Sequence, residues 1–478
     1  MSGFSPARAR LRRAVAAAVL LGATGSAANG RFPNGGYVVA APGAAGDLLA
    51  VRATFGILTS RDGGRTWAWT CEDAIGSSGV FEASLAIAFD GAVLATTPRG
   101  LIATHDGCAW SVPIGSPGRP VVDISQDATR RVLVTAVGPS GADDALLRSM
   151  DGGATWMAGA ALPGLYTQTV EVAPSDPRRI YASGFLVDGT PLLYRSDDGG
   201  STVVEVARGA AFMGGTNAFI SGVDPTDPGV LYVRSADGLG TMLLRSADGG
   251  ASFRQVARTA GEMAGFAISD DGSTLWIGSR RPSEGILRSE HGGAFVPTGA
   301  RLSVQCLRQF AGTLYVCADP ATDGFMLGCS RDRGDHVAPL LAPRSLTGPP
   351  SDCAPSTPVA TLCAPLWPAQ RAILQSLDGG LPVALDSACF PFDSAFDDAA
   401  VDVPLRLDQP SVDAPARLDA VGSDGPVADA GSARDAGPSP PSHPGCQCRA
   451  GASSRPQLGA LVLFALIWFR RGRHSRVL

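Results

Sequence analysis

A short motif that recurs along the chain constrains its fold more than any other feature of the sequence. The first copy, Ser60–Trp67, reads SRDGGRTW, and the pattern Ser-x-Asp-x-Gly-x-Thr-Trp returns six more times with varying degeneracy. The seven copies begin at residues 60, 104, 149, 196, 246, 289 and 330, so that they are 41 to 50 residues apart. A fixed period of this length is typical of solenoids and propellers, in which each repeat buries its apolar face against its neighbours.

The residues around each motif predict four short strands per repeat. Alternating apolar and polar residues around the copy at Ser196 predict strands at 169–173, 179–183, 192–195 and 203–207. The same order of strands and turns returns around 219–257. Four antiparallel strands per period of about 45 residues are typical of a β-propeller blade. The sequence therefore predicts an all-β fold, a β-propeller of seven four-stranded blades.

The motif fits the loop between the third and fourth strands of a blade. Its glycines allow the positive φ angles of a tight hairpin, and its aspartate can accept backbone N–H groups within the loop. A ring of metal-binding carboxylates is the alternative, but it would require side chains on separate blades to converge on one cation. We therefore assign structural roles to the motif aspartates Asp62, Asp106, Asp151, Asp198, Asp248 and Asp332.

These octads resemble the Asp-box (BNR) repeats of sialidase-like β-propellers, and the resemblance covers roughly residues 31–341. It implies the propeller fold but no single activity, because that superfamily includes hydrolases, lectin-like modules, receptors and assembly factors. The Phe/Tyr-Arg-Ile-Pro motif of sialidases has its nearest counterpart in Arg-Phe-Pro-Asn at 31–34, where the order differs. An arginine directly precedes the motif serine in four repeats, which predicts blade-surface or blade-seam positions rather than a converging triad. These residues are Arg148, Arg195, Arg245 and Arg288.

The sequence assigns no residue to catalysis, to a cofactor or to a metal. Glycoside hydrolysis needs two carboxyl groups that flank the scissile bond. The candidate carboxyl groups are those of Asp143, Asp144, Glu171 and Glu262. Their spacing in the sequence does not show that any two of them meet. The chain has no G-x-S-x-G, H-E-x-x-H, P-loop or dinucleotide-binding motif. Its net charge of −5 argues against a nucleic-acid partner.

Both ends of the chain carry patterns of targeting signals. Residues 1–28 combine arginines, an apolar run and small residues, which predicts a secretory signal cleaved after Ala28. Near the other end, Cys446 and Cys448 precede the apolar segment 458–469 and an arginine cluster. This order resembles the MYXO-CTERM sorting tail of Gram-negative surface proteins, which implies recognition by processing machinery and attachment to the cell surface. The alternative is an ordinary short membrane anchor, although about 20 residues are needed for a stable transmembrane helix.

These observations divide the chain into five parts. They are a signal peptide (1–28), the propeller (29–342), a cysteine-containing closing or capping extension (343–392), a disordered Asp/Ala/Pro-rich linker (393–444) and the sorting tail (445–478).

An exported chain with ten cysteines is expected to form disulfides. Cys306 and Cys317 are equidistant from a predicted turn and would face each other across a hairpin. Cys71 follows the first motif and Cys108 lies in the second, which predicts a bridge between adjacent blades. The cysteines expected to staple the region after the last blade are Cys329, Cys353, Cys363 and Cys389.

The function that this organisation predicts is recognition. A rigid ring with variable loops suits the non-catalytic binding of a polysaccharide or protein partner, or a scaffold role at the cell surface. The alternative is an exported glycoside hydrolase of the sialidase-like superfamily with an unrecognised active site.

Overall fold

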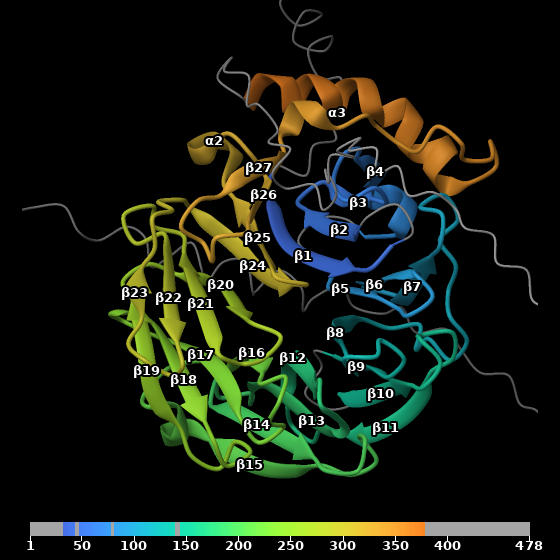
Figure 1. Ribbon diagram of the computed structural model, residues 1–478. Helices are drawn as coiled ribbons and strands as arrows, with labels where there is room; N and C mark the ends of the chain where they lie inside the picture. Colours follow the sequence, from blue (N-terminus) through green and yellow to red (C-terminus); the bar gives the residue numbers. More distant parts are fainter. Residues whose placement is uncertain (1–31, 44–46, 78–80, 139–143, 378–478) are drawn as a thin grey trace, which may run out of the picture. The chain divides into compact units, whose positions relative to one another are not determined.

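Seven antiparallel sheets form a β-propeller ring in the computed structural model, which describes residues 32–43, 47–77, 81–138 and 144–377 (Figure 1). The first strands of neighbouring blades pack against one another around the ring, so they line its centre. The predicted all-β, seven-bladed fold is confirmed. All described residues belong to one compact unit, Met1–Asp398.

The strands follow one another in chain order within each blade. Blade 1 contains β1 (Gly35–Ala41), β2 (Leu48–Ala53), β3 (Gly56–Ser60) and β4 (Ala68–Cys71). Blade 2 contains β5 (Leu85–Ile87), β6 (Val93–Thr97) and β7 (Gly100–Thr104), and blade 3 contains β8 (Val121–Gln126), β9 (Leu133–Val137), β10 (Ala145–Ser149) and β11 (Met157–Ala161). Blade 4 contains β12 (Tyr166–Ala173), β13 (Asp176–Phe185), β14 (Pro191–Ser196) and β15 (Val204–Arg208).

The remaining blades have the same plan. Blade 5 contains β16 (Phe219–Val223), β17 (Leu231–Asp237), β18 (Gly240–Ser246) and β19 (Arg254–Thr259). Blade 6 contains β20 (Met263–Ile268), β21 (Thr274–Ser279), β22 (Ile286–Glu290) and β23 (Val296–Pro297), and blade 7 contains β24 (Val304–Phe310), β25 (Thr313–Ala318), β26 (Leu327–Ser330) and β27 (Ala338–Leu341). The helical segments are η1 (Glu72–Ile75), η2 (Gly209–Phe212), α2 (Pro320–Asp323), η3 (Pro343–Ser345), η4 (Val359–Cys363) and α3 (Ala364–Leu377).

Blade 2 departs from the plan at its outer edge. Its sheet has three strands, and a single bridge between Ala103 and Ser111 takes the place of the fourth. The motif of this blade, THDGCAW, lacks one residue of the octad, as does SEHGGAF in blade 6, where the fourth strand β23 has only two residues. The shortened loop and the reduced strand therefore occur together.

The antiparallel order of the strands fixes which loops share a face of the ring. Loops after the first and third strands of a blade lie on one face, which we call the motif face because it carries the octad motifs. Loops after the second strands, and the connections between blades, lie on the other face. We call this the start face, because the first strand of each blade begins there.

Hydrogen bonds within each octad close the loop at the motif face. In the first copy, Asp62 accepts the backbone N–H of Thr66 at 2.9 Å and its hydroxyl at 2.6 Å, while Ser60 donates to Asp62 at 2.8 Å. Gly63 and Gly64 have φ angles of 73° and 95°, which residues with a side chain resist. The equivalent bonds form around Asp106, Asp151, Asp198, Asp248 and Asp332. Each of these carboxylates is thus engaged within its own loop.

The arginines that precede the motif serine span the seams between blades. Arg148 donates to the carbonyl of Gly199 at 3.0 Å, and Arg195 donates to that of Gly249 at 3.1 Å. Arg288 donates to the carbonyl of Arg333 at 2.9 Å. In all three cases the acceptor is the fourth residue of the motif in the next blade. The seam positions of these three arginines are confirmed and they do not converge on one site, whereas Arg245 bonds to Tyr232 of its own blade.

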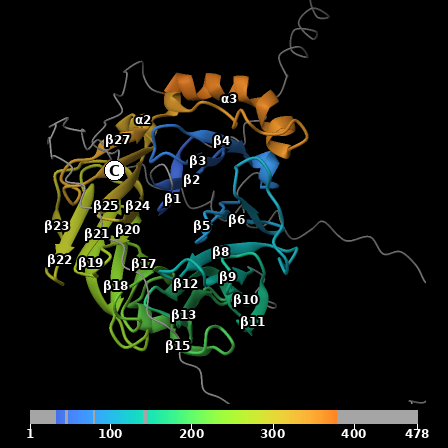
Figure 2. The same ribbon diagram turned by 45° about the vertical axis from the view of Figure 1, so that its right-hand side comes forward.

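The segment after β27 covers the outer edge of blade 1. Gly348 accepts the N–H of Trp69 at 2.8 Å, and the Thr347 hydroxyl donates to the carbonyl of Trp67 at 2.7 Å. The indole of Trp367, on α3, lies 5.5 Å from that of Trp69 between ring centroids. Figures 1 and 2 both show α3 beside blade 1. Unpaired edge strands invite association with other chains, so this cover protects β4.

Disulfides fasten the same segment to the first two blades. Cys71 is bonded to Cys363, and Cys108 is bonded to Cys353. The predicted bridge between Cys71 and Cys108 is therefore wrong. The physical reason is topological: Cys71 ends β4 at the start face, whereas Cys108 lies in a motif loop at the opposite face.

The remaining predictions about cysteines divide between described and undescribed residues. The hairpin disulfide Cys306–Cys317 is present, with the two Cα atoms 4.7 Å apart, and Cys329 is also disulfide-bonded. The residues named in the other predictions, Ala28, Cys389, Cys446 and Cys448, lie outside the described residues, as does the linker. Among the described residues no helix is long and apolar enough to span a membrane, and the apolar segment 458–469 is not among them.

Candidate functional site

The first strands of five blades each contain a β-bulge near the start face, at one register position. A bulge bends its strand and re-aims the extra residue, and such irregularities are common next to functional sites. The bulged residues are Gly36, Val122, Gln168, Ala264 and Gln305. In blade 5 the bulge falls two register positions further along, at Ser221.

Asp123, the residue after the bulge in β8, joins the inner strands of three blades. Its carboxylate accepts the Thr169 hydroxyl at 2.8 Å and the N–H of Val170 at 3.0 Å, both on β12. Its other oxygen accepts the N–H of Ile124 at 2.9 Å, and Ser84 of blade 2 adds a further hydrogen bond. Only 9% of Asp123 is exposed, and burial raises its pKa. Both carboxylate oxygens are thus engaged by the protein.

Glu171 lies on β12, the first strand of blade 4, which packs against the strand β8 that carries Asp123. The Ser125 hydroxyl of β8 donates to it at 2.7 Å and accepts the N–H of Val172 at 3.1 Å. Burial raises the pKa of Glu171 to about 7, and the charge of Asp123 adds to this effect. We call the set Ser84, Asp123, Ser125, Thr169 and Glu171 the polar belt, since its side chains bond the inner strands of blades 2, 3 and 4.

Groups from opposite sides of the ring reach this belt. Burial raises the pKa of Tyr37 on β1, and the charges of Asp123 and Glu171 raise it further. Arg308 on β24 acts in the opposite direction on both Tyr37 and Glu171. Residues from blades 1, 3, 4 and 7 influence one another in this way only because the centre of the ring brings them together.

The structure separates the four carboxylates that the sequence offered as candidates. Glu171 faces another carboxylate, but its neighbour is Asp123, which the sequence did not single out. Asp144 is buried and accepts the N–H of Thr167 at 3.0 Å, while Glu262 forms an ion pair with Arg280 at 3.2 Å. Asp143 lies outside the described residues. A residue-by-residue alignment of the repeats could have revealed Asp123 as a charge at a strand position where most blades have small or neutral residues.

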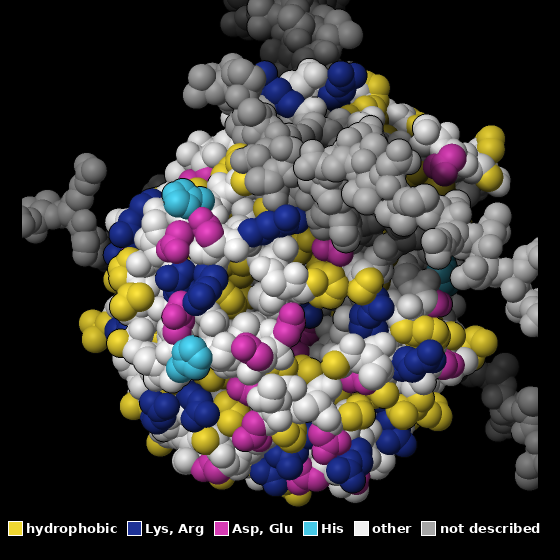
Figure 3. All heavy atoms as spheres, in the orientation of Figure 1, with side chains coloured by type: hydrophobic (Ala, Val, Ile, Leu, Met, Phe, Trp, Pro, Cys, Tyr) yellow, Lys and Arg dark blue, Asp and Glu magenta, His cyan; other side chains and the backbone are white. Residues whose placement is uncertain are grey.

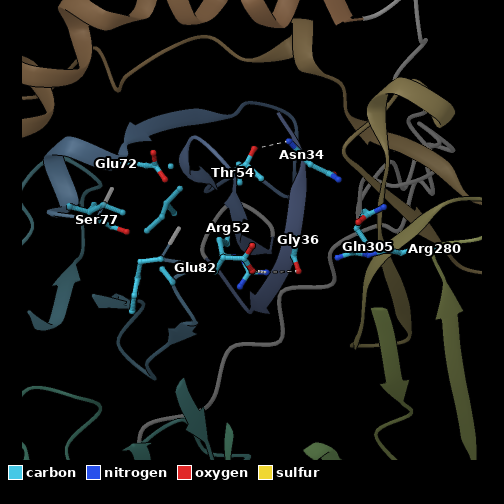
Figure 4. A pocket seen from close by; sticks show the side chains of 15 residues that line it. Asn34, Gly36, Arg52, Thr54, Glu72, Ser77, Glu82, Arg280 and Gln305 are labelled. Carbon is cyan, nitrogen blue, oxygen red and sulfur yellow. Dashed lines mark hydrogen bonds and ion pairs between the residues drawn. The ribbon is translucent and has the colours of Figure 1, made fainter. Parts of the chain in front are cut away.

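A recess of about 90 Å³ opens on the start face between blades 1, 2, 6 and 7 (Figure 4). The bulged residues Gly36 and Gln305 line it, together with Asn34 and Arg52 of blade 1. A typical pocket for a whole small ligand has roughly 300 to 1,000 Å³, so this recess suits one protruding group of a larger molecule.

Both arginines that line the recess are already paired. Arg52 forms an ion pair with Glu82 at 3.2 Å and donates to the carbonyl of Gly36 at 3.1 Å. Arg280 forms its ion pair with Glu262 at 3.2 Å. Acidic and basic side chains also lie among one another over the visible face in Figure 3, without a large patch of one sign. Neither the recess nor this face attracts ligands of one charge at long range.

Arg52 departs from the repeat. The equivalent second-strand position is occupied by small or uncharged residues in five blades: Thr96, Ala136, Ser183, Gly278 and Cys317. Blade 5 has Arg234, which covers the Phe219 ring at 4.6 Å and donates to the carbonyl of Ala264 at 3.0 Å. Burial lowers the pKa of Arg234 to about 10. Arg234 is therefore a packed residue, whereas Arg52 lines the recess.

One group of potential metal ligands stands out among the described residues, and its chemistry excludes a metal site. Cys108, Cys353 and Asp352 have ligand atoms within 4.8 Å of one another. The two sulfurs form a disulfide, so no thiolate is free to bind a cation.

Comparisons with known proteins found solved structures that resemble part of this chain. No protein-family model and no curated protein matches the sequence. An ancestral GH74 enzyme has 14% identity and a TM-score of 0.47, with 65% of this chain and 46% of that chain covered. The GH74 xyloglucanase from Xanthomonas campestris has 18% identity and a TM-score of 0.38, with 67% and 56% covered. YCF48 from Cyanidioschyzon merolae has 16% identity and a TM-score of 0.39, with 55% and 88% covered. The chain thus spans about half the length of the two GH74 enzymes.

Proposed function

We propose that this protein is an exported, surface-attached β-propeller that binds a polysaccharide or protein partner without transforming it. The recess on the start face carries this proposal, because it is small, polar and lined by bulged residues. It can hold a protruding group of a larger partner, but it is too small to enclose a substrate. Loops on a rigid ring are well placed for such recognition.

The proposal includes the placement of the protein outside the cytoplasm. The three disulfides with both cysteines described suit an oxidising compartment. The signal-like residues 1–28 and the MYXO-CTERM-like tail would direct export and attachment, with Cys446 as the processing site. We also assign the octads to the Asp-box type, on the strength of their repeated serine, aspartate and glycine contacts.

Binding and cleavage can be separated in one experiment. The full chain, exported and oxidised, would be incubated with an array of bacterial and host polysaccharides and with intact cells. Bound material would be quantified, and the glycans would be weighed by mass spectrometry. We expect retention with unchanged glycan mass. Shortened glycans would refute the non-catalytic role, and retention on cells without glycan binding would indicate a protein partner.

A glycoside hydrolase is the second candidate, and the Asp123–Glu171 pair favours it. Such enzymes use two carboxyl groups, one with a raised pKa, and Glu171 has a pKa of about 7. Against it, both oxygens of Asp123 accept hydrogen bonds from the protein. If the array shows cleavage, Glu171→Gln should lower the rate by roughly 10² to 10⁴. An unchanged rate would exclude this pair.

A further inference from the structure

We infer that the recess selects a neutral, hydroxyl-bearing sugar unit and rejects an anionic one, with the Arg52–Glu82 pair as the selecting element. This inference rests on the proposed binding function and names the ligand class for it. Two features of the recess support it: a hydrogen-bond acceptor without a partner, and an arginine whose charge is balanced by a carboxylate. The equivalent arginine of blade 5, which lines no recess, provides a comparison.

The unpaired acceptor is Asn34 Oδ1. Two hydrogen bonds fix the backbone of Asn34. Its N–H donates to the Thr54 hydroxyl at 3.0 Å, and its carbonyl accepts the Thr54 N–H at 2.9 Å. The Oδ1 atom is nevertheless buried and has no hydrogen-bond partner among the described residues. A buried acceptor needs a donor. A sugar hydroxyl can donate, whereas an ionised carboxylate can only accept.

The arginine whose positive charge is balanced by a carboxylate is Arg52. Figure 4 shows its guanidinium beside Glu82 and Gly36, the two partners to which it is bonded. The Arg52 side chain is 20% exposed and that of Glu82 is 58% exposed. An anion approaching Arg52 would meet the carboxylate of Glu82, and two like charges at close range repel each other. A neutral hydroxyl leaves the ion pair intact, so Glu82 acts as a filter by repulsion.

Blade 5 shows what the same position looks like without a recess. Arg234 stacks on Phe219 and donates to the carbonyl of Ala264, a residue of the next blade. Its charge is turned into the seam and its Nε atom is buried. Only in blade 1, among the blades as described, does an arginine at this position line a recess and carry an exposed carboxylate partner.

The test uses matched pairs of ligands with the oxidised full chain. Hexasaccharides of glucose, mannose and galactose would each be compared with the hexasaccharide of the corresponding uronic acid, by calorimetric titration. We expect at least one neutral member to bind at least tenfold more tightly than its acidic counterpart. A tenfold ratio corresponds to about 1.4 kcal/mol.

Three variants connect the preference to the recess. Glu82→Gln frees Arg52 and should raise the affinity for the acidic member at least tenfold, with the neutral affinity changed less than threefold. Glu205→Gln is the matched control, because it frees Arg208, an exposed arginine of blade 4 that is paired with Glu205 at 2.6 Å. It should change neither affinity. Asn34→Ala should weaken neutral binding about tenfold, with thermal unfolding as the check on folding.

The outcomes that overturn the inference are distinct from those that overturn the proposed function. Tighter binding of the acidic member by the wild-type chain, or identical effects of Glu82→Gln and Glu205→Gln, would refute the neutral selection while leaving glycan binding intact. Binding of neither member, with retention on cells preserved, would refute the sugar ligand alone. Loss of both glycan binding and cell retention would refute the proposed function as well.

Discussion

Two parts of the ring are held together by different means. In blades 3 to 7 an arginine crosses the seam at three of the four boundaries, from Arg148, Arg195 and Arg288. At the same position before the motif serine, blades 7, 1 and 2 have Cys329, Thr59 and Ala103. There, disulfides and the segment after β27 supply the connection instead. We call these parts the arginine-joined part and the disulfide-joined part.

The difference follows from where the chain begins and ends. Blades 1 and 7 are each built from four consecutive strands, so no strand is exchanged between them to close the ring. Tyr315 of blade 7 donates to Asp47 of blade 1 at 2.9 Å across this boundary. A repeated residue can join neighbouring repeats, but the boundary between the first and last repeats needs added covalent and packing interactions.

The largest expected effect comes from breaking the disulfide-joined part. Cys71→Ser with Cys363→Ser should lower the free energy of unfolding by about 2 to 5 kcal/mol, because in the unfolded chain it releases the roughly 47 residues that lie between this bridge and the intact Cys108–Cys353 bridge. Urea denaturation would measure the loss, and hydrogen exchange should show faster exchange in 343–377. The control is Cys306→Ser with Cys317→Ser, a bridge across only 11 residues, which should cost roughly 1 kcal/mol less on chain entropy. Equal losses would contradict this account.

The second effect concerns the polar belt, which bonds the inner strands of blades 2, 3 and 4. The pKa of Glu171 is raised to about 7 in the folded protein, so its protonated form is favoured there. The contribution of protonated Glu171 to the free energy of unfolding is fully present below its ordinary pKa of 4.5 and is lost as pH rises through 7. Glu171→Gln, which stays neutral, should therefore match the wild type at pH 4 and exceed its free energy of unfolding by about 3 kcal/mol at pH 8.

Glu205→Gln is the control for this measurement. Arg208 holds the pKa of Glu205 below its ordinary value, so the stabilising contribution of that carboxylate is present above 4.5 and disappears as pH falls. Between pH 4 and pH 8, urea unfolding should show the stability effects of the two variants changing in opposite directions. A change in the same direction for both would mean that burial does not control Glu171.

A smaller loss is expected from a single seam of the arginine-joined part. Arg195→Ala removes the hydrogen bond to Gly249 and the ion pair with Asp197, and should cost about 1 to 2 kcal/mol. Arg195→Lys keeps the charge but loses the two-pronged geometry, so it should recover only part of this loss. Hydrogen exchange should increase in blades 4 and 5 and stay unchanged in blades 7, 1 and 2. A uniform increase around the ring would show that the seams are not independent.

The smallest effect is expected within one motif loop. The hydroxyl and N–H of Ser252 bond to Asp248 and hold its pKa at about 2. This carboxylate contributes stability above its ordinary pKa of 3.8, and the contribution is lost as pH falls towards 2. Asp248→Asn should cost about 0.5 kcal/mol at pH 7, since the loop is exposed, and should match the wild type near pH 2. A constant difference between the two pH values would point to lost geometry rather than lost charge.

The sequence predicted the repeated parts of the molecule well and the unique parts poorly. Each strand and loop of a blade is encoded locally, and seven copies of the octad reinforce one another, so the seven blades could be recognised. Glu171 could be named as a candidate, but its closeness to Asp123 could not be predicted, because two different blades bring them together. The bulges at Gly36 and Gln305 depend on strand register, which no local pattern reveals. The partners of Cys71 and Cys108 depend on which face of the ring each residue reaches.

The long disulfides also have a consequence for the order of assembly. During synthesis Cys71 emerges 292 residues before Cys363, which corresponds to about 15 to 60 s at 5 to 20 residues per second. Cys108 becomes available much sooner, so early oxidation favours the non-native pair Cys71–Cys108. Only thiol–disulfide exchange, which proceeds in seconds to hours, can then release the trapped pair. If oxidation begins before Cys363 is available, correct closure of the ring therefore requires an isomerase, whereas later oxidation avoids the trapped pair.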